Sequence, residues 1–177
     1  MFNNQKEAQI PIILVNHRGE KIGLSTKQEA HEKGLLHLAF SVFIRHEKTG
    51  KILLQQRASG KYHAPDLWAN ACCGHPGLIS EDVLESAKLR LEEELGIRAS
   101  LKIKGQFTYF HQFKPNLFEH EYDFVLEGII GDQDILFNSQ EVQAFKWMDQ
   151  QEVLKDLLQH PERYAPWFFM AINTYIA

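Results

Sequence analysis

A thiol and an imidazole stand close together near the middle of the chain. Cys73 and His75 are two residues apart, so on an extended segment their side chains point to the same side. Cys72 would then point the opposite way, and we expect it to be a buried structural thiol. A helical pattern follows, and it ends in three consecutive glutamates at positions 92–94, just before Leu95 and Gly96. This stretch therefore offers an acid/base group, a metal ligand and a cation-binding helix.

Further ligands for a divalent cation lie in two other segments. His31 and His37 flank a short segment of the chain. Glu119 and Glu121 share one face if their own segment is extended. Together with His75, these three imidazoles and two carboxylates suit a borderline ion such as Zn²⁺ or Mn²⁺. No spacing ties the remaining candidates to this cluster, and we interpret them as ordinary polar residues: His17, His46, His63, His111 and His160.

Three basic residues are candidates for binding phosphate. Lys27, Arg57 and Lys61 lie in segments that flank the same predicted strands. Arg suits bidentate contact with phosphate and Lys suits a point-charge contact, although the ordinary alternative is solvated surface charge. The glutamates at 92–94 also have two interpretations, because consecutive carboxylates on a helix diverge by about 100°. Either they form a solvated face, or at least one of them reaches a Mg²⁺ that also holds a diphosphate.

Hydrophobic periodicity and turn signals predict the elements that must position these residues. We expect strands at residues 10–15, 37–45, 51–57, 101–113, 121–130 and 144–148, with the second and third forming a hairpin. We expect helices at 152–159 and 161–176, and a helical or irregular segment at 25–33. Another helix should begin at an N-cap, Ser80, and stop at Gly96, with Val83, Leu84, Ala87, Leu91 and Leu95 as its apolar stripe. This order predicts an α+β fold, a mixed or antiparallel sheet covered by helices.

Composition narrows the class of protein. A chain of 177 residues with 44% hydrophobic and 24% charged residues predicts one soluble domain spanning residues 1–177. The net charge of −4 argues against a broad surface for nucleic acid or anionic membrane, and no apolar run approaches the ~20 residues of a membrane helix. Two adjacent cysteines do not easily form a framework disulfide, and residues 1–7 lack the apolar stretch of a secretory signal. We therefore expect a reducing, cytoplasmic location.

One stretch resembles a known metal–diphosphate motif. Gly74, Glu81 and the run at 89–97 resemble a Nudix box, a loop–helix–loop that binds a metal–diphosphate complex. The Nudix pattern has Arg and Glu where this chain has Leu89 and Arg90, and one extra residue separates Gly74 from Glu81. The missing Glu belongs to the metal-binding set of the Nudix hydrolases. These departures argue against ordinary Nudix hydrolysis.

From about residue 12 to residue 171, the chain resembles the type 1 isopentenyl-diphosphate Δ-isomerases, which have a Nudix fold. Five segments carry the resemblance, in order and at compatible spacing: 34–43 (GLLHLAFSVF), 55–61 (QQRASGK), 72–76 (CCGHP), 119–121 (EHE) and 165–167 (APW). Five such segments in order are far more specific than one short motif. The resemblance implies a Nudix-type mixed sheet sandwiched by helices, and a monomer whose partner is a small isoprenoid diphosphate.

The resemblance also implies a metal site and a diphosphate site. A tightly bound Mn²⁺ or Zn²⁺ would have five ligands, namely His31, His37, His75, Glu119 and Glu121. Glu94 would help to hold a Mg²⁺ that accompanies the substrate diphosphate. The phosphates themselves would contact Lys27, Arg57 and Lys61.

The implied reaction converts isopentenyl diphosphate to dimethylallyl diphosphate by moving the double bond one carbon along. Cys73 and Glu121 would be the catalytic pair, assisted by Tyr109, and Trp167 would lie against the isoprenoid carbon skeleton. Protonating an unactivated alkene makes a carbocation-like state, which an aromatic face stabilises. Two other classes remain open: a Nudix pyrophosphohydrolase of a nucleoside diphosphate derivative, and a non-enzymatic module with an inert zinc.

Overall fold

The computed structural model describes residues 8–77 and 80–177. Its elements in chain order are β1 (Pro11–Val15), β2 (Lys21–Thr26), α2 (Lys27–Lys33), β3 (His37–His46), β4 (Ile52–Arg57), β5 (Trp68–Ala69), β6 (Cys72–Gly74), α3 (Val83–Leu95), β7 (Leu101–Lys114), β8 (Leu117–Ile130), β9 (Val142–Met148), α4 (Gln150–Gln159), a 3₁₀ turn (Pro161–Arg163) and α5 (Phe168–Ile176). The expectation about a signal segment at residues 1–7 lies outside the described residues. Within the described ranges, no helix is long and apolar enough to cross a membrane.

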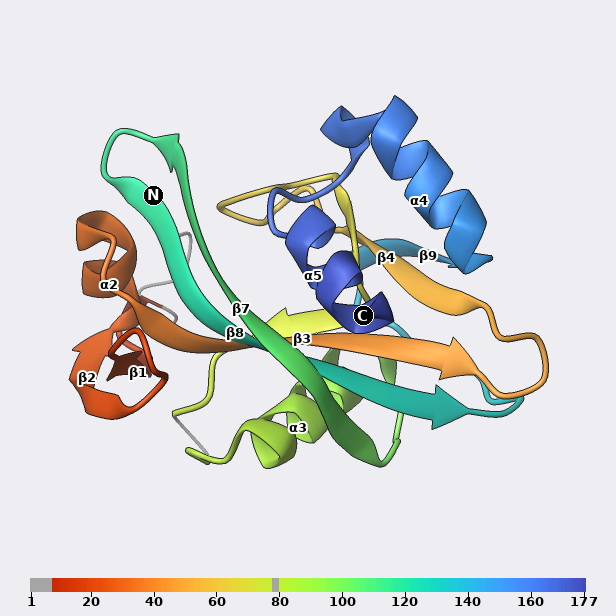
Figure 1. Cartoon of the computed structure of the whole chain (residues 1–177), viewed down its shortest axis with the longest axis horizontal. Helices are drawn as coiled ribbons and strands as arrows, with labels where there is room; N and C mark the ends of the chain where they lie inside the picture. The colour runs from red at the N-terminus through yellow and green to blue at the C-terminus, as the bar shows by residue number, and fades with distance from the viewer. Residues whose placement is uncertain (1–7, 78–79) are drawn as a thin grey trace.

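Strand β3 is the centre of the mixed sheet. One path of the sheet runs β2-β1-β3-β4-β5, and β6 pairs with β3 antiparallel. Strand β8 pairs with β3 in parallel, from His37 opposite Glu121 to His46 opposite Ile130, and forms a long hairpin with β7 (Figure 1). The predicted hairpin of 37–45 with 51–57 is wrong over most of its length, because only one β3–β4 pair is in register. Strands β8 and β9 take the neighbouring positions instead.

Helices cover both faces of the sheet, so the predicted α+β sandwich is confirmed (Figure 1). Side chains of β3 alternate between the two faces as strand geometry requires. Val42 and Ile44 pack in the cluster that contains the apolar stripe of α3. Phe43 packs in the opposite cluster with α4 and α5, where its ring stacks on Tyr175 at 4.5 Å between centroids.

Helix α3 buries the predicted apolar stripe and ends at the predicted glycine, but it begins later than predicted. Ala87, Leu91 and Leu95 are buried, and Gly96 adopts the left-handed conformation that ends the helix. The N-cap is Asp82 rather than Ser80, because the Asp82 carboxylate accepts the hydrogen bond from the Glu85 amide at 2.9 Å.

Two further element predictions need correction. Residues 25–33 contain the end of strand β2 as well as helix α2, because Ser25 and Thr26 pair antiparallel with β1. The predicted helix at 161–176 is split into a 3₁₀ turn and α5. Ala165 precedes a proline, which disfavours helical conformation, and its amide donates to the carbonyl of Trp68 at 2.9 Å.

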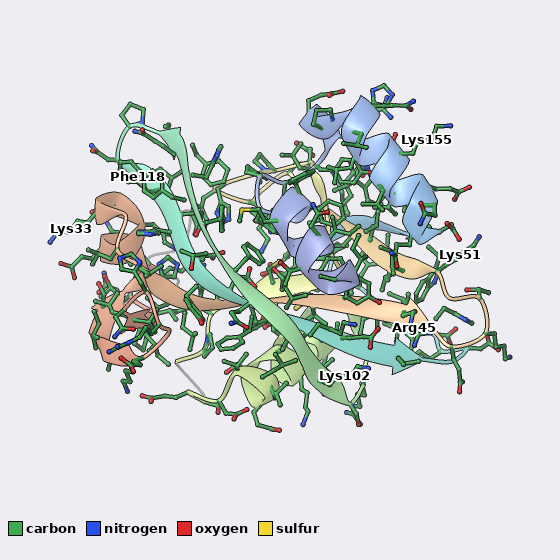
Figure 2. The ribbon with its side chains drawn as sticks, in the orientation of Figure 1. Lys33, Arg45, Lys51, Lys102, Phe118 and Lys155 are labelled. Atoms are coloured by element: carbon green, nitrogen blue, oxygen red, sulfur yellow. The ribbon has the colours of Figure 1, made fainter. Side chains whose placement is uncertain are left out.

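The charged surface lies away from the centre of the sheet. Figure 2 shows Lys33, Lys51 and Lys155 at the periphery with their side chains directed outward. Lys33 pairs with Glu29 on the same helix at 2.7 Å. Such exposed pairs contribute little to stability.

Candidate active site

A cavity of about 540 Å³ gathers most of the residues that the sequence singles out. Its lining comes from α2, the loop between β4 and β5, β6, α3, the β7–β8 hairpin and the segment before α5. Ten predicted site residues line it, namely Lys27, Arg57, Lys61, Cys73, His75, Glu94, Tyr109, Glu119, Glu121 and Trp167. The other two, His31 and His37, are fully buried beside His75, with ring centroids 5.6 and 4.9 Å from it. Tertiary structure therefore brings together all twelve residues.

Four of the predicted metal ligands form a compact cluster. His31, His37, His75 and Glu119 each offer one ligand atom, and these atoms lie within 4.8 Å of one another. Glu121, the fifth, places Oε1 2.9 Å from Nε2 of His75. Local geometry explains the convergence, since alternation along β8 puts Glu119 and Glu121 on one face and parallel register sets Glu121 opposite His37.

The short turn after α2 brings the first two histidines together. Gly34 ends α2 in the left-handed conformation, with φ 65°, which glycine adopts without strain. His37 then starts β3, and its Nδ1 lies 2.8 Å from the carbonyl of Leu35. Since a carbonyl only accepts, Nδ1 carries the proton. Nε2 of His37 therefore presents a lone pair to the cluster, 3.3 Å from Nε2 of His75.

The cluster suits a divalent cation. Burial lowers the pKa of His31 and His37 well below the usual range, so both imidazoles are neutral. Burial raises the pKa of Glu119 and Glu121, and the Glu121 charge raises that of Glu119 further. Within the described residues, Oε2 of Glu119 accepts no hydrogen bond. Neutral imidazoles and two crowded buried carboxylates are the donor set that Zn²⁺ or Mn²⁺ prefers.

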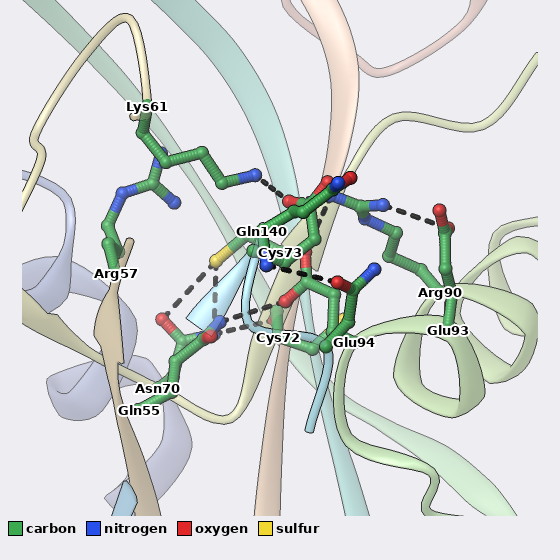
Figure 3. A network of polar contacts seen from close by, with 12 residues as sticks. Gln55, Arg57, Lys61, Asn70, Cys72, Cys73, Arg90, Glu93, Glu94 and Gln140 are labelled. Atoms are coloured by element: carbon green, nitrogen blue, oxygen red, sulfur yellow. Dashed lines mark hydrogen bonds and ion pairs between the residues drawn. The ribbon is translucent and has the colours of Figure 1, made fainter. Parts of the chain in front are cut away.

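Cys73 and Cys72 point to opposite sides of β6, as predicted. Cys72 is fully buried in the core beneath α3, whereas Cys73 faces the cavity. Nδ2 of Asn70 lies 3.1 Å from the Cys73 sulfur, and the thiol lies 3.4 Å from Oδ1 of the same amide (Figure 3). Burial raises the pKa of Cys73 to about 12, which favours the protonated thiol.

Tyr109 and Trp167 complete the apolar wall of the cavity. Tyr109 stands opposite Glu121 in the β7–β8 register, and burial raises the pKa of its hydroxyl well above the usual range. The indole of Trp167 donates to Oδ1 of Asn70 at 3.3 Å. Asn70 therefore links Trp167 to the Cys73 thiol through one buried amide.

The three predicted phosphate contacts line the same cavity. The Arg57 guanidinium donates to the carbonyls of His63 and Ala64 at 3.2 and 3.1 Å, which holds it in place. Lys61 contacts the carboxylate of Glu141, and burial lowers the pKa of the Lys61 ammonium to about 8. Lys27 begins α2 and lies 5.2 Å from the ring centroid of Tyr62. Three cationic side chains therefore line the cavity, and one of them, Lys61, forms an ion pair with Glu141.

Comparison with known proteins agrees with this architecture. A NUDIX domain profile matches residues 35–168. An isopentenyl-diphosphate Δ-isomerase of Aliivibrio fischeri (strain MJ11) is 40% identical over 163 residues, covering 89% of this chain and 90% of that protein. Isopentenyl-diphosphate Δ-isomerase 2 of Aromatoleum aromaticum is 37% identical over 166 residues, covering 94% of this chain and 86% of that protein. The chain belongs to the isopentenyl-diphosphate Δ-isomerase family.

Solved structures share the fold of this Δ-isomerase family member. DR0079 from Deinococcus radiodurans superposes with a TM-score of 0.74 at 18% identity, covering 94% of this chain and 99% of that one. The MutT protein of Methanosarcina mazei Go1 superposes with a TM-score of 0.65 at 18% identity, covering 80% and 93% of the two chains. At this identity the likeness concerns the fold alone.

In this Δ-isomerase family member, the segment at 74–97 that resembles a Nudix box directs only some of its glutamates to the cavity. Glu94 is buried, accepting from Gln55 at 3.0 Å and pairing with Arg90 at 2.7 Å (Figure 3). Glu93 is exposed and also pairs with Arg90. Glu81 lies on the surface, where it pairs with Lys21 at 2.6 Å. The acidic helix therefore presents one buried carboxylate to the cavity, and Glu81 takes no part in its lining.

Several residues of the site escaped the sequence analysis of this Δ-isomerase family member. The interpretation of His63 as an ordinary polar residue outside the cluster is wrong, because its Nε2 lies 3.1 Å from Oε1 of Glu119. Asn70, Tyr62 and Glu141 also contact predicted site residues, namely Cys73, His31 and Lys61. Their position offered a weak signal, since Tyr62 and His63 directly follow Lys61 and Asn70 lies just before the cysteines. No spacing rule predicts which residues such a loop brings to a distant strand.

Proposed function

We propose that this protein converts isopentenyl diphosphate to dimethylallyl diphosphate by protonation and deprotonation. The observation that carries the proposal is that Cys73 and Glu121 reach one cavity from different strands, β6 and β8. One group adds a proton to the terminal alkene carbon, and the other removes a proton from the carbon on the far side of the resulting cationic centre. The double bond thus moves while the substrate keeps its number of protons.

The proposed metal centre holds one of these two groups. His31, His37, His75, Glu119 and Glu121 would bind Mn²⁺ or Zn²⁺, as their lone pairs and crowded carboxylates support. When bound, the ion would lower the pKa of its carboxylate ligand. Tyr109 stands opposite Glu121 on the neighbouring strand, where its hydroxyl would orient a proton at the carboxylate.

The buried thiol supplies the second group. Cys73 is not among the proposed metal ligands, so it remains available for proton transfer. Asn70 can donate to the sulfur and accept from the thiol, with contacts of 3.1 and 3.4 Å. This amide therefore accommodates both protonation states of Cys73 during a catalytic cycle.

The Trp167 ring in the apolar wall would stabilise the carbocation-like state. Trp167 presents an indole that is 4% exposed and already attracts a cation, since the Arg57 guanidinium lies 5.1 Å from its ring centroid. A dehydrated π face contributes about 2 kcal/mol to binding a cation. Exclusion of water also protects the cation from capture.

The diphosphate anchors the substrate and takes no part in proton transfer. Lys27, Arg57 and Lys61 would bind it, together with a Mg²⁺ held by Glu94. This binding energy would position the carbon end of the substrate against Cys73 and Glu121. We further propose a monomer in the cytoplasm, where a reducing environment agrees with the two unbridged cysteines.

Proton exchange with solvent tests the reaction. Metal-loaded protein is incubated with isopentenyl diphosphate and Mg²⁺ in deuterated water, and the products are followed by NMR. Dimethylallyl diphosphate carrying deuterium is the expected product. Unchanged substrate from folded, metal-loaded protein would reject the proposal, and released phosphate or pyrophosphate would indicate a hydrolase.

A further inference from the structure

The loop that carries Lys61 also reaches the cluster of proposed metal ligands. Its next residue, Tyr62, places its hydroxyl 2.7 Å from Nδ1 of His31. The residue after that, His63, places Nε2 3.1 Å from Oε1 of Glu119. We infer that Tyr62 and His63 are positioning residues for the metal centre, which they tie to the phosphate-binding loop.

His63 directs the carboxylate of Glu119. The His63 side chain is 11% exposed, and within the described residues its Nδ1 has no hydrogen-bond partner. A neutral imidazole carries one proton, which we place on Nε2, 3.1 Å from Oε1 of Glu119. This contact engages Oε1 and leaves Oε2 of Glu119 facing His31 and His37, at 3.5 and 3.8 Å from their Nε2 atoms. His63 thereby selects the oxygen that points to the cluster.

Tyr62 orients the imidazole of His31 in a similar way. Its hydroxyl engages Nδ1, so Nε2 of His31 is the nitrogen directed at the cluster. The carbonyl of Leu35 does the same for His37, whose Nδ1 it engages at 2.8 Å. Outer partners of this kind fix the tautomer and the orientation of metal-binding histidines. The Tyr62 ring also stacks on His31, with centroids 5.8 Å apart.

The backbone of the loop is held by a proposed phosphate ligand. Arg57 donates to the carbonyls of His63 and Ala64, and Ala64 has a positive φ of 46°. A non-glycine residue holds this conformation only where its surroundings enforce it. The loop is therefore fixed at both ends of the cavity. Arg57 holds its backbone near the proposed phosphate contacts, and Tyr62 and His63 contact the proposed metal ligands.

The test is the affinity for Mn²⁺, measured by calorimetry on the full chain after chelator treatment. Tyr62→Phe removes the hydroxyl, and His63→Phe keeps an aromatic ring but removes the donor. Each should weaken Mn²⁺ binding by about 10–100-fold, the usual effect of losing an outer-shell partner. His63→Gln should restore most of the affinity, because the glutamine amide can donate to Glu119 from a similar position.

Matched controls use the same substitutions elsewhere. Tyr122→Phe, in β8, and His160→Phe, at the end of α4, change residues that do not line the cavity, and both should bind Mn²⁺ like the wild type. Unchanged affinity in Tyr62→Phe and His63→Phe would overturn the inference, and so would failure of His63→Gln to exceed His63→Phe. The inference rests on the metal centre of the proposed function. Lack of Mn²⁺ binding by the wild type would overturn that centre itself, which distinguishes the two failures.

Discussion

The carboxylate of Glu141 and the guanidinium of Arg90 form an ion pair of 2.7 Å in the wall of the cavity, beside Lys61. The same carboxylate contacts Lys61, so one internal anion neutralises two cations there. Glu141 itself is anchored by its backbone, whose amide donates to the carbonyl of Asn138. A diphosphate bound as we propose would therefore compete with Glu141 for Lys61.

Glu141→Gln should strengthen the binding of inorganic pyrophosphate with Mg²⁺. Removing a competing ion pair worth about 1 kcal/mol lowers Kd by about five-fold. Calorimetric titration measures this change. Glu93→Gln is the matched control, because Glu93 also pairs with Arg90 at 2.8 Å but its side chain is 58% exposed, so the effect should be smaller. Weaker pyrophosphate binding by Glu141→Gln would instead mean that Glu141 orders Lys61 and Arg90 for the ligand.

Cys73→Ala should abolish turnover while the protein keeps its metal. In the proposed mechanism the thiol transfers a proton, and losing such a group costs about 10²–10⁴-fold in rate. The thiol is not a proposed metal ligand, so the metal should stay bound. The measurements are kcat and metal content by atomic emission. Cys72→Ala is the control, because Cys72 lies in the core on the other side of β6, and it should lower stability but leave catalysis intact. Loss of stoichiometric metal from Cys73→Ala would contradict the assignment.

His75→Ala should lower metal content, because Nε2 of His75 lies among the proposed ligands. Removal of metal from the wild type should in turn lower the melting temperature, since an ion at 100 times its Kd stabilises the fold by about 2.7 kcal/mol. His75→Ala should show a smaller difference between metal-loaded and chelator-treated protein. His160→Ala, a change in an exposed surface histidine, serves as control. Full occupancy in His75→Ala would exclude His75 as a ligand.

Gly74→Ala should disturb both stability and catalysis. A Cβ at this position would lie 2.7 Å from Cζ of Phe40, closer than real contacts allow. The clash should cost about 1–3 kcal/mol and displace the neighbouring Cys73. Urea unfolding and kcat report the two effects. Phe40→Leu in the same chain should relieve the clash, so the double variant should lose less stability than the sum of the single variants. Additive losses would show that β6 shifts without meeting Phe40.

Local periodicity made the main features of the site predictable. A period of two along a strand is set by backbone geometry, so Cys73 faces away from Cys72 wherever β6 lies. The same period puts Glu119 and Glu121 on one face of β8. The stripe of α3 and its stop at Gly96 follow equally from local spacing and from the conformational freedom of glycine.

Other features depend on contacts between residues far apart in the chain. Whether β3 pairs along its length with β4 or with β8 is decided by long-range register, which the short spacing between residues 37–45 and 51–57 does not reveal. The N-cap is Asp82 and not the predicted Ser80. Both side chains can accept a hydrogen bond near the start of the helix, and only the path of the backbone selects between them.

The sequence by itself determined the family and the types of residue available for catalysis and binding, because residue types and short-range spacing are local properties of the chain. Only the tertiary structure decided which other side chains contact these residues. It placed His63 against Glu119, Tyr62 against His31, and Glu141 between Lys61 and Arg90. Each of these pairs joins a loop to an element far away in the chain, and the relative placement of such segments is a result of packing the whole sheet between its helices.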